Sequence, residues 1–224
     1  MGFLRRLSLD HHITLLTLKR STMSPTENLK REHEAMYEVL NIMSKIANDI
    51  KEKKVFYTTD IDSIVDFLIV FWCNCHNQKE EQVFYPALVR AGIQTDDESI
   101  GDITHEHSMG RIYIREMSYS IENCKIGNSF SCEKLVDSLN NYVNLLRFHI
   151  QKEEEVLFPK ADVVFTEENL CEISNQFEVI EEQTIGHSIH EQYFELLKHL
   201  NGKYNEVAPT MYKLEYAKEL FYAS

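Results

Sequence analysis

The sequence HNQKEEQVFYP at positions 76–86 occurs a second time, slightly altered, as HIQKEEEVLFP at positions 149–159. Each copy carries a histidine and a glutamate four residues apart, His76 with Glu80 and His149 with Glu153. Residues at this spacing lie on one face of an α-helix, so each copy would present an imidazole beside a carboxylate. This spacing is typical of metal-binding helices.

The duplication continues upstream of both copies. The segment LKREHEAM carries Glu32 and His33, and the segment ITHEHSMG carries Glu106 and His107, 74 residues later. The sequence therefore predicts that one αα-hairpin occurs twice, with a histidine on its first helix and a His/Glu pair on its second.

The composition predicts the fold class. The chain has 224 residues, of which 43% are apolar, and this is enough for one domain with a sizeable core. Only seven glycines and four prolines interrupt it, which favours long helices over short strands and turns. We expect an all-α protein, an antiparallel four-helix bundle of two repeated αα-hairpins with additional C-terminal helices.

Local signals place the expected helices. Ser24-Pro25-Thr26-Glu27 is a strong helix start, and Thr95 to Glu98 matches a capping box. Helices are expected over about 24–51, 59–92, 95–123, 131–159, 167–183 and 187–200. Pro159 is expected to end the fourth helix, and Gly186 and Gly202 to end the last two. We expect three parts, a disordered extension at 1–22, the bundle at 23–160 and a C-terminal helical extension at 161–224 packed on it.

Charge and cysteine content limit the partners. Lys and Arg number 23 against 36 Asp and Glu, and the formal net charge of −13 repels nucleic acid and anionic lipid surfaces. The apolar stretch ITLLTL near the N-terminus is too short to span a membrane. Five cysteines without a CxxC pair indicate free, buried thiols in a reducing compartment, so we expect a cytoplasmic protein.

The histidines and glutamates of the repeats fall on the apolar faces of their helices. At alternating steps of three and four residues, the apolar positions of each helix include these side chains, so they point toward the core. His105 lies about 200° around the helix from His107 and points away from it. The candidate metal ligands are His33, His76, Glu80, His107, His149 and Glu153.

Burial of these groups together favours a bound cation. A single histidine on an apolar face is usually a hydrogen-bonded core residue. Two buried carboxylates are different, because each costs several kcal/mol without a proton, an arginine or a cation as partner. No Lys or Arg lies on these apolar faces near the repeats, so a metal is the expected partner.

The donor set indicates which metal. Structural zinc prefers thiolates and Ca²⁺ or Mg²⁺ prefers oxygen, whereas imidazoles and carboxylates from four helices suit a pair of irons. Four histidines, two bridging glutamates and a bridging oxygen leave about two of twelve coordination positions open, enough for O2 or NO.

These residues resemble a known family. Glu32-His33, Glu106-His107 and the segments around His76 and His149 are similar to the hemerythrin-like proteins, named for their HHE cation-binding motif. The resemblance covers about residues 24–200 and implies a four-helix bundle whose iron ligands are the same six residues.

The sequence departs from the family's oxygen carriers in two places. Those carriers have a His-x-x-x-His pair, and Ser108 to Arg111 supply no second histidine after His107. Asn77 stands where relatives often have another histidine. These departures count against a reversible oxygen carrier but not against a di-iron site.

Neighbouring residues have other expected roles. Glu81 and Glu154 lie about 100° off the ligand face, which favours solvated or outer positions over direct ligation. Glu32 and Glu106 could orient imidazoles or be solvated helix charges. Trp72 is expected to fill the core. His187 and His190, in HxxH spacing on a late helix, are expected at the surface.

Three functions follow from the sequence. The leading hypothesis is a non-haem di-iron protein that binds O2 or NO for sensing, scavenging or delivery. The second is an iron-handling or iron-sulfur-centre repair protein acting under oxidative or nitrosative stress. The third is a metal-free helical interaction module. A binding role is favoured, and the sequence leaves an enzymatic role and any protein partner open.

Overall fold

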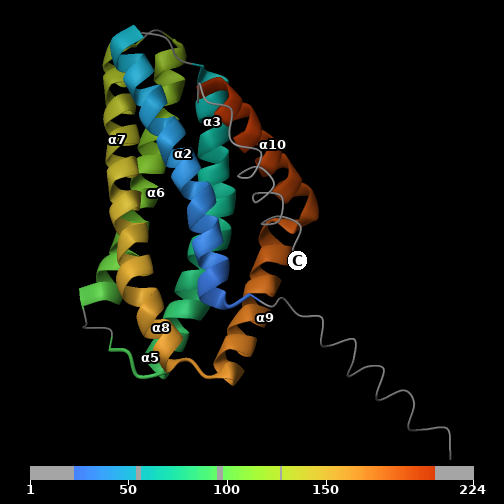
Figure 1. The fold of residues 1–224 in the computed structure, drawn as a ribbon. Helices are drawn as coiled ribbons and strands as arrows, with labels where there is room; N and C mark the ends of the chain where they lie inside the picture. Colours follow the sequence, from blue (N-terminus) through green and yellow to red (C-terminus); the bar gives the residue numbers. More distant parts are fainter. Residues whose placement is uncertain (1–22, 54–56, 95–97, 127, 205–224) are drawn as a thin grey trace, which may run out of the picture.

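The computed structural model describes residues 23–53, 57–94, 98–126 and 128–204 (Figure 1). Within these residues the protein is helical and contains no strand, so the predicted all-α class is confirmed. The expected disordered extension at 1–22, the tail after residue 204 and most of the capping box at Thr95 lie outside the described residues.

The first helix, α2, spans Pro25–Lys53 and begins where the sequence predicts. The Ser24 side chain accepts a hydrogen bond from the backbone N–H of Glu27 at 3.2 Å, and the Glu27 carboxylate accepts one from the backbone N–H of Ser24 at 2.8 Å. This reciprocal pair is the predicted capping box, and it fixes the start of the helix two turns before His33.

The second helix runs without a break from Thr58 to Arg90, through five segments that alternate between α and π geometry. It begins at Thr58, one residue before the predicted start at Thr59, and its N-cap residue Tyr57 makes no side-chain capping bond. Its segments are α3 Thr58–Phe67, η1 Leu68–His76, α4 Asn77–Lys79, η2 Glu80–Phe84 and α5 Tyr85–Arg90, where η marks a π-helix.

The third and fourth helices repeat this arrangement. Helix α6 spans Glu98–Lys125, and the fourth helix consists of α7 Ser129–Lys152, η3 Glu153–Leu157 and α8 Phe158–Val164. The expectation that Pro159 ends the fourth helix is wrong, because the helix continues to Val164.

A π turn precedes Pro86 and another precedes Pro159, and these turns explain why the second and fourth helices continue past the prolines. The backbone N–H of Tyr85 bonds to the carbonyl of Glu80, and that of Phe158 bonds to the carbonyl of Glu153, each five residues back. The wider turn places the proline at the start of a fresh α segment, where its missing N–H is tolerated. Each π turn begins at the glutamate of the repeated motif.

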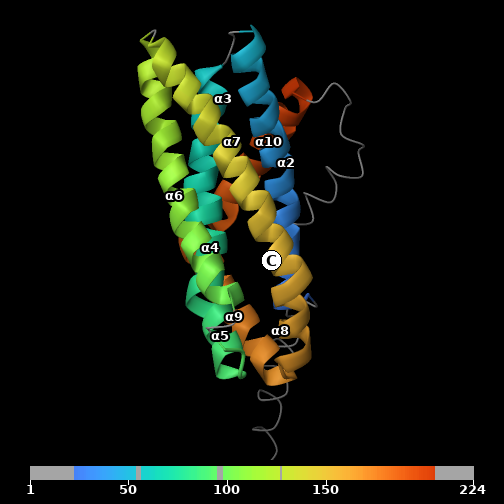
Figure 2. The same ribbon diagram turned by 90° about the vertical axis from the view of Figure 1, so that its left-hand side faces the viewer.

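The four long helices form an antiparallel bundle (Figures 1 and 2). Its core consists of two apolar clusters, one that includes Met36, Trp72 and Leu146 and one that includes Leu29, Phe84 and Phe158. His33 lies between Leu29 and Met36 along α2, so the repeated spacing of the motif sets the polar residues between the two clusters. Packing on both sides therefore holds them in place.

Two further helices, α9 Glu167–Thr184 and α10 Gly186–Tyr204, pack along the bundle beside α2 and the second helix (Figure 1). Gly186 has a φ of +56° and separates them, as predicted. Gly202 does not end α10, which continues to Tyr204. Helix α9 contacts η1, α4 and η2, the part of the second helix that carries the repeated motif.

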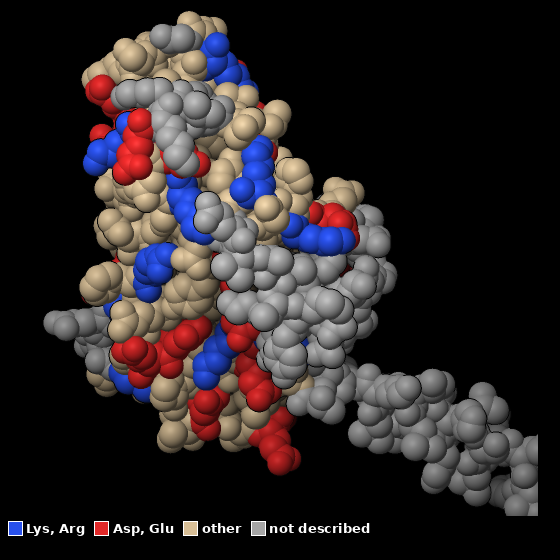
Figure 3. All heavy atoms as spheres, turned by 45° about the horizontal axis from the view of Figure 1, so that its top comes forward, with Lys and Arg blue, Asp and Glu red and all other residues tan. Residues whose placement is uncertain are grey.

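The surface agrees with the acidic composition. In the face shown in Figure 3, basic and acidic side chains are interspersed in the upper part, and acidic ones gather toward the lower end. None of the described helices is both long and apolar enough to cross a membrane.

The cysteines provide a test of the packing. All five are free thiols, and burial raises the pKa of Cys73 to about 11 and that of Cys75 further, whereas Cys171 is exposed. A raised pKa leaves little thiolate at pH 8, and the thiolate is the nucleophile. With iodoacetamide at pH 8, we expect Cys171 to be alkylated first and Cys73 and Cys75 only after unfolding. Mass spectrometry of timed digests would measure this, and equal rates would contradict the described core.

Candidate metal centre

The structure brings all six predicted site residues together. Their potential ligand atoms form two groups of four, and within each group these atoms lie within 4.8 Å of one another. His33 and His76 belong to one group and His107 and His149 to the other, while Glu80 and Glu153 belong to both. All six side chains are almost completely buried.

The two glutamates lie between the two pairs of imidazoles. Glu80 Oε1 is 3.3 Å from His76 Nε2, and Glu80 Oε2 is 3.3 Å from His107 Nε2, so its two oxygens face different groups. Glu153 Oε2 lies 3.3 Å from His33 Nε2 and 3.4 Å from His149 Nε2. The two groups of potential ligand atoms therefore lie side by side and share both carboxylates.

Most of the inward-facing atoms lack a hydrogen-bond partner, whereas His107 Nε2 and His149 Nε2 lie 3.1 Å apart and are hydrogen-bonded to each other. Among the described residues, the Nε2 atoms of His33 and His76, both oxygens of Glu80 and Glu153 Oε2 are buried without a hydrogen bond. Buried polar atoms are rarely left in this state, because each costs about 1–3 kcal/mol. A cation between them would satisfy several at once, so the residues present fit a metal pair.

A carboxylate holds the outer nitrogen of each imidazole. The Nδ1 atoms of His33 and His76 lie 2.9 Å from Glu154 Oε1 and 2.7 Å from Glu32 Oε2. Those of His107 and His149 lie 2.7 Å from Glu81 Oε1 and 3.1 Å from Glu106 Oε2. A proton donated from Nδ1 to a carboxylate leaves the Nε2 lone pair free for a metal and fixes the ring orientation.

These contacts settle what the sequence left open. Glu81 and Glu154 lie outside the inner cluster, as predicted, and they bind imidazoles instead of being only solvated. Glu32 and Glu106 orient imidazoles too. The signal in the sequence was their place beside the inward histidines in both repeats.

The four outer contacts follow an approximate two-fold symmetry. Glu32 to His76 and Glu106 to His149 are contacts within one hairpin. Glu154 to His33 and Glu81 to His107 join the two hairpins. Each hairpin therefore orients a histidine of the other.

The carboxylates around His76 and His107 raise the pKa values of these histidines, and the imidazoles in turn lower the pKa of Glu80. Burial lowers the pKa of His76, but the Glu80 carboxylate and the hydrogen bond to Glu32 outweigh burial and raise the pKa to about 10. Burial also lowers the pKa of His107, but its hydrogen bonds to Glu80 and Glu81 outweigh burial and raise this pKa to about 9. Burial raises the pKa of Glu80, yet the neighbouring imidazoles hold it well below its usual range. A cation that replaces these protons would release them on binding.

One aromatic position breaks the symmetry. Phe158 stacks on His33 with ring centroids 5.5 Å apart, and Tyr85, at the equivalent place of the other repeat, stacks on His107 at 6.1 Å. The Tyr85 hydroxyl donates a hydrogen bond of 2.5 Å to Glu153 Oε1. This leaves only Oε2 of Glu153 to face the imidazoles, whereas Glu80 presents both oxygens.

A buried lysine that was not among the predicted residues lies behind the site. Lys79 is completely buried, and its Nζ donates to Glu32 Oε1, to Glu181 Oε2 of α9 at 2.9 Å and to Asn28 Oδ1 at 3.2 Å. Its partners are outer carboxylates, so it does not neutralise Glu80 or Glu153. In both repeats a Gln-Lys pair comes directly before the inner glutamate, and this repetition could have indicated a role for the lysine. In the second repeat, Lys152 donates a hydrogen bond to Glu106 in the same way.

Other predicted residues lie as follows. Trp72 is buried in the core, as expected, and stacks on His76 with ring centroids 3.8 Å apart. His105 is exposed on the opposite side of α6 from His107. The side chains of His187 and His190 lie outside the described residues, so their expected surface position stays a prediction.

Comparisons with known proteins agree with this geometry. Residues 24–161 match the family model of the hemerythrin HHE cation-binding domain. The chain belongs to this family. The hemerythrin-like match covers the four bundle helices, and α9 and α10 follow it along the chain.

The chain is also similar to uncharacterized proteins of Mycobacterium bovis and Mycobacterium tuberculosis. They are 22% identical to it over 160 residues, which cover 71% of this chain and 62% of each relative. The match therefore spans less than two thirds of these relatives. No solved structure matches the chain significantly.

The buried lysine can be tested against its repeat counterpart. Replacing Lys79 by Met leaves Glu32 and Glu181 without their buried cation, and we expect a loss of about 3–5 kcal/mol in unfolding free energy. Lys152→Met is the matched control, because Lys152 is 33% exposed and its loss should cost about 1 kcal/mol or less. Chemical denaturation of both variants at equal metal loading measures the difference. Equal losses would contradict the role of α9 in this contact.

Proposed function

We propose that this hemerythrin-like protein holds two non-haem irons and binds O2 or NO, for sensing, scavenging or delivery. The observation that supports it most is the pair of four-residue groups that share Glu80 and Glu153. Mixed imidazole and carboxylate donors suit iron better than thiolate-preferring structural zinc or oxygen-preferring Ca²⁺ and Mg²⁺. A cytoplasmic location belongs to the same proposal.

In this function the chain's own residues perform three tasks. His33, His76, His107 and His149 would hold the irons, with Glu80 and Glu153 between them. The outer carboxylates keep the imidazoles oriented, and the two apolar clusters exclude water. Bound iron would supply the open positions and the redox chemistry that O2 or NO requires.

One contact favours the second candidate, an iron-handling or iron-sulfur-centre repair protein. Arg111, four residues after His107, occupies the place of the second histidine of the oxygen carriers, and its Nη2 donates to Glu81 at 2.6 Å. The Glu81 carboxylate therefore serves both Arg111 and His107. A centre with four histidines is less saturated than one with five, which suits exchange of iron as well as binding of a ligand.

The site assignment is tested by iron stoichiometry. After anaerobic loading with Fe(II), we expect about two irons per wild-type chain and loss of this pair in His107→Ala and Glu153→Ala, since each removes a ligand. His105→Ala is the matched control, because His105 lies two residues from His107 and is exposed. Full stoichiometry in both ligand variants would reject the assignment. An unchanged melting temperature with and without iron would favour the metal-free module.

Optical spectra distinguish the two candidate functions. The iron-loaded protein is recorded under argon, O2 and NO, and we expect a new absorption band with O2 or NO that is absent under argon. A binding protein should lose the O2 band on deoxygenation and regain it over repeated cycles with its iron retained. Transfer of iron to an acceptor instead would support the repair candidate.

A further inference from the structure

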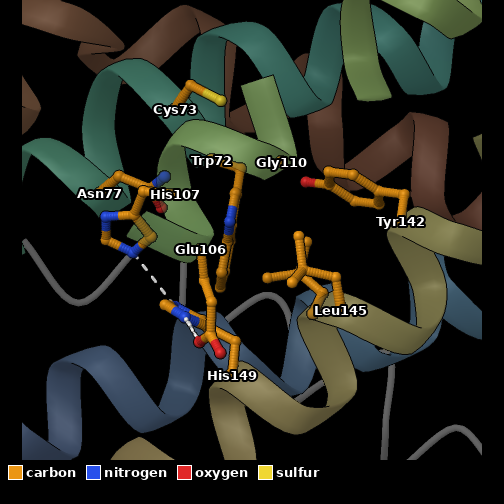
Figure 4. A pocket seen from close by; sticks show the side chains of 10 residues that line it. Trp72, Cys73, Asn77, Glu106, His107, Gly110, Tyr142, Leu145 and His149 are labelled. Carbon is orange, nitrogen blue, oxygen red and sulfur yellow. Dashed lines mark hydrogen bonds and ion pairs between the residues drawn. The ribbon is translucent and has the colours of Figure 1, made fainter. Parts of the chain in front are cut away.

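A small cavity reaches one half of the candidate metal centre. Its volume is about 10 Å³, close to the minimum for one water-sized molecule. Its lining includes His107, His149 and the outer carboxylate Glu106, but neither His33 nor His76 and neither of the shared glutamates. Figure 4 shows the imidazoles of His107 and His149 joined by a dashed line, with Trp72 beside them. The two cation positions therefore differ in their access to space.

The sequence repeat explains where this space comes from. Gly110 lines the cavity, and the equivalent residue of the first repeat, three positions after His33, is Met36. Met36 is completely buried in the larger apolar cluster, so the first repeat packs a long side chain at the position where the second repeat has none. A Cβ added at Gly110 would meet only Tyr142 Cε2, at 3.5 Å. Gly110 is thus the residue that keeps the cavity open.

Trp72 and a contact with α9 cover His76, which belongs to the other cation position. The ring of Trp72 stacks on His76 and also lines the cavity, so it lies against His76 on that side. Lys79 ties Glu32, the partner of His76, to Glu181 of α9. In the second repeat, Lys152 is 33% exposed, and no α9 contact equivalent to Glu181 is present among the described residues.

Two buried polar atoms line the cavity without partners. Tyr142 Oη and Asn77 Oδ1 have no hydrogen bond among the described residues. In Figure 4 the hydroxyl end of Tyr142 is directed toward Gly110. A buried hydroxyl without a partner costs about 1–3 kcal/mol, which a ligand that accepts its hydrogen bond would offset.

We propose that the small diatomic ligand binds at the cation position of His107 and His149, in the cavity kept open by Gly110, and accepts a hydrogen bond from Tyr142. This inference rests on the proposed function and adds the place and the residues that select the ligand. The cavity does not reach His33 and His76, so their position then serves to complete the centre.

Access of a diatomic to the cavity can be measured without iron. Trp72 is the single tryptophan of the chain and lines the cavity, so its fluorescence reports on it. In the zinc-loaded protein, where the metal is redox-inert, O2 quenches this fluorescence by collision. We expect Gly110→Ala to lower the quenching constant, because its methyl group takes the space. Gly202→Ala is the matched control, because a Cβ added at Gly202 has no neighbour within 4 Å. O2 should quench the fluorescence of this variant as it does that of the wild type.

Binding of NO by the iron-loaded protein tests the position itself. We expect Gly110→Ala to retain two irons but to weaken NO binding about tenfold, the effect of one misplaced carbon in a tight pocket. Tyr142→Phe should keep the iron and the stability but release NO faster. Met36→Leu, a volume-conserving change beside His33, should leave NO binding unchanged.

The outcomes separate the two proposals. A wild-type protein that holds iron but binds neither NO nor O2 would overturn the proposed function. A wild-type protein that binds NO, together with a Gly110→Ala variant that binds it equally well and is quenched equally, would overturn the cavity as the binding place. A larger effect of Met36→Leu than of Gly110→Ala would move the ligand to His33 and His76.

Discussion

Two buried carboxylates that face one another across four imidazoles are the constraint on which the structure depends. Glu80 and Glu153 are completely buried, and among the described residues their ion-pair partners are the four histidines. Such a cluster is unfavourable in an apolar interior unless protons or cations neutralise it. The carboxylates behind each imidazole, the π turns at both glutamates and the apolar clusters on either side all hold this group in one arrangement.

The repeat makes the centre symmetric, and a few side chains make it unequal. Tyr85 differs from Phe158 by a hydroxyl that occupies one oxygen of Glu153. Gly110 differs from Met36 by the side chain that fills the core. Helix α9 adds a third difference, because Glu181 reaches Lys79 on one side only. All six inner groups stay in place despite these differences, although one oxygen of Glu153 is taken by Tyr85, so the two halves can take different roles around the same carboxylates.

The sequence predicted the fold class and the convergence of the six inner residues, because both depend on helical periodicity. It failed where three-dimensional packing or hydrogen-bond register decides. The fourth helix continues past Pro159 because a π turn shifts its bonding pattern, and spacing alone does not reveal that turn. Lys79 was missed because its partner Glu181 comes from a helix 102 residues away in sequence. The cavity depends on a missing side chain whose surroundings only coordinates supply.

The exchange of outer carboxylates between hairpins bears on how the protein arose. Because Glu154 serves His33 and Glu81 serves His107, one hairpin by itself lacks a partner for its first histidine. Two identical copies of such a hairpin, joined by a rotation axis, would supply every missing group to each other. A self-associating ancestor with half the length of the bundle would thus already contain a complete centre, and gene fusion would then have allowed each half to diverge.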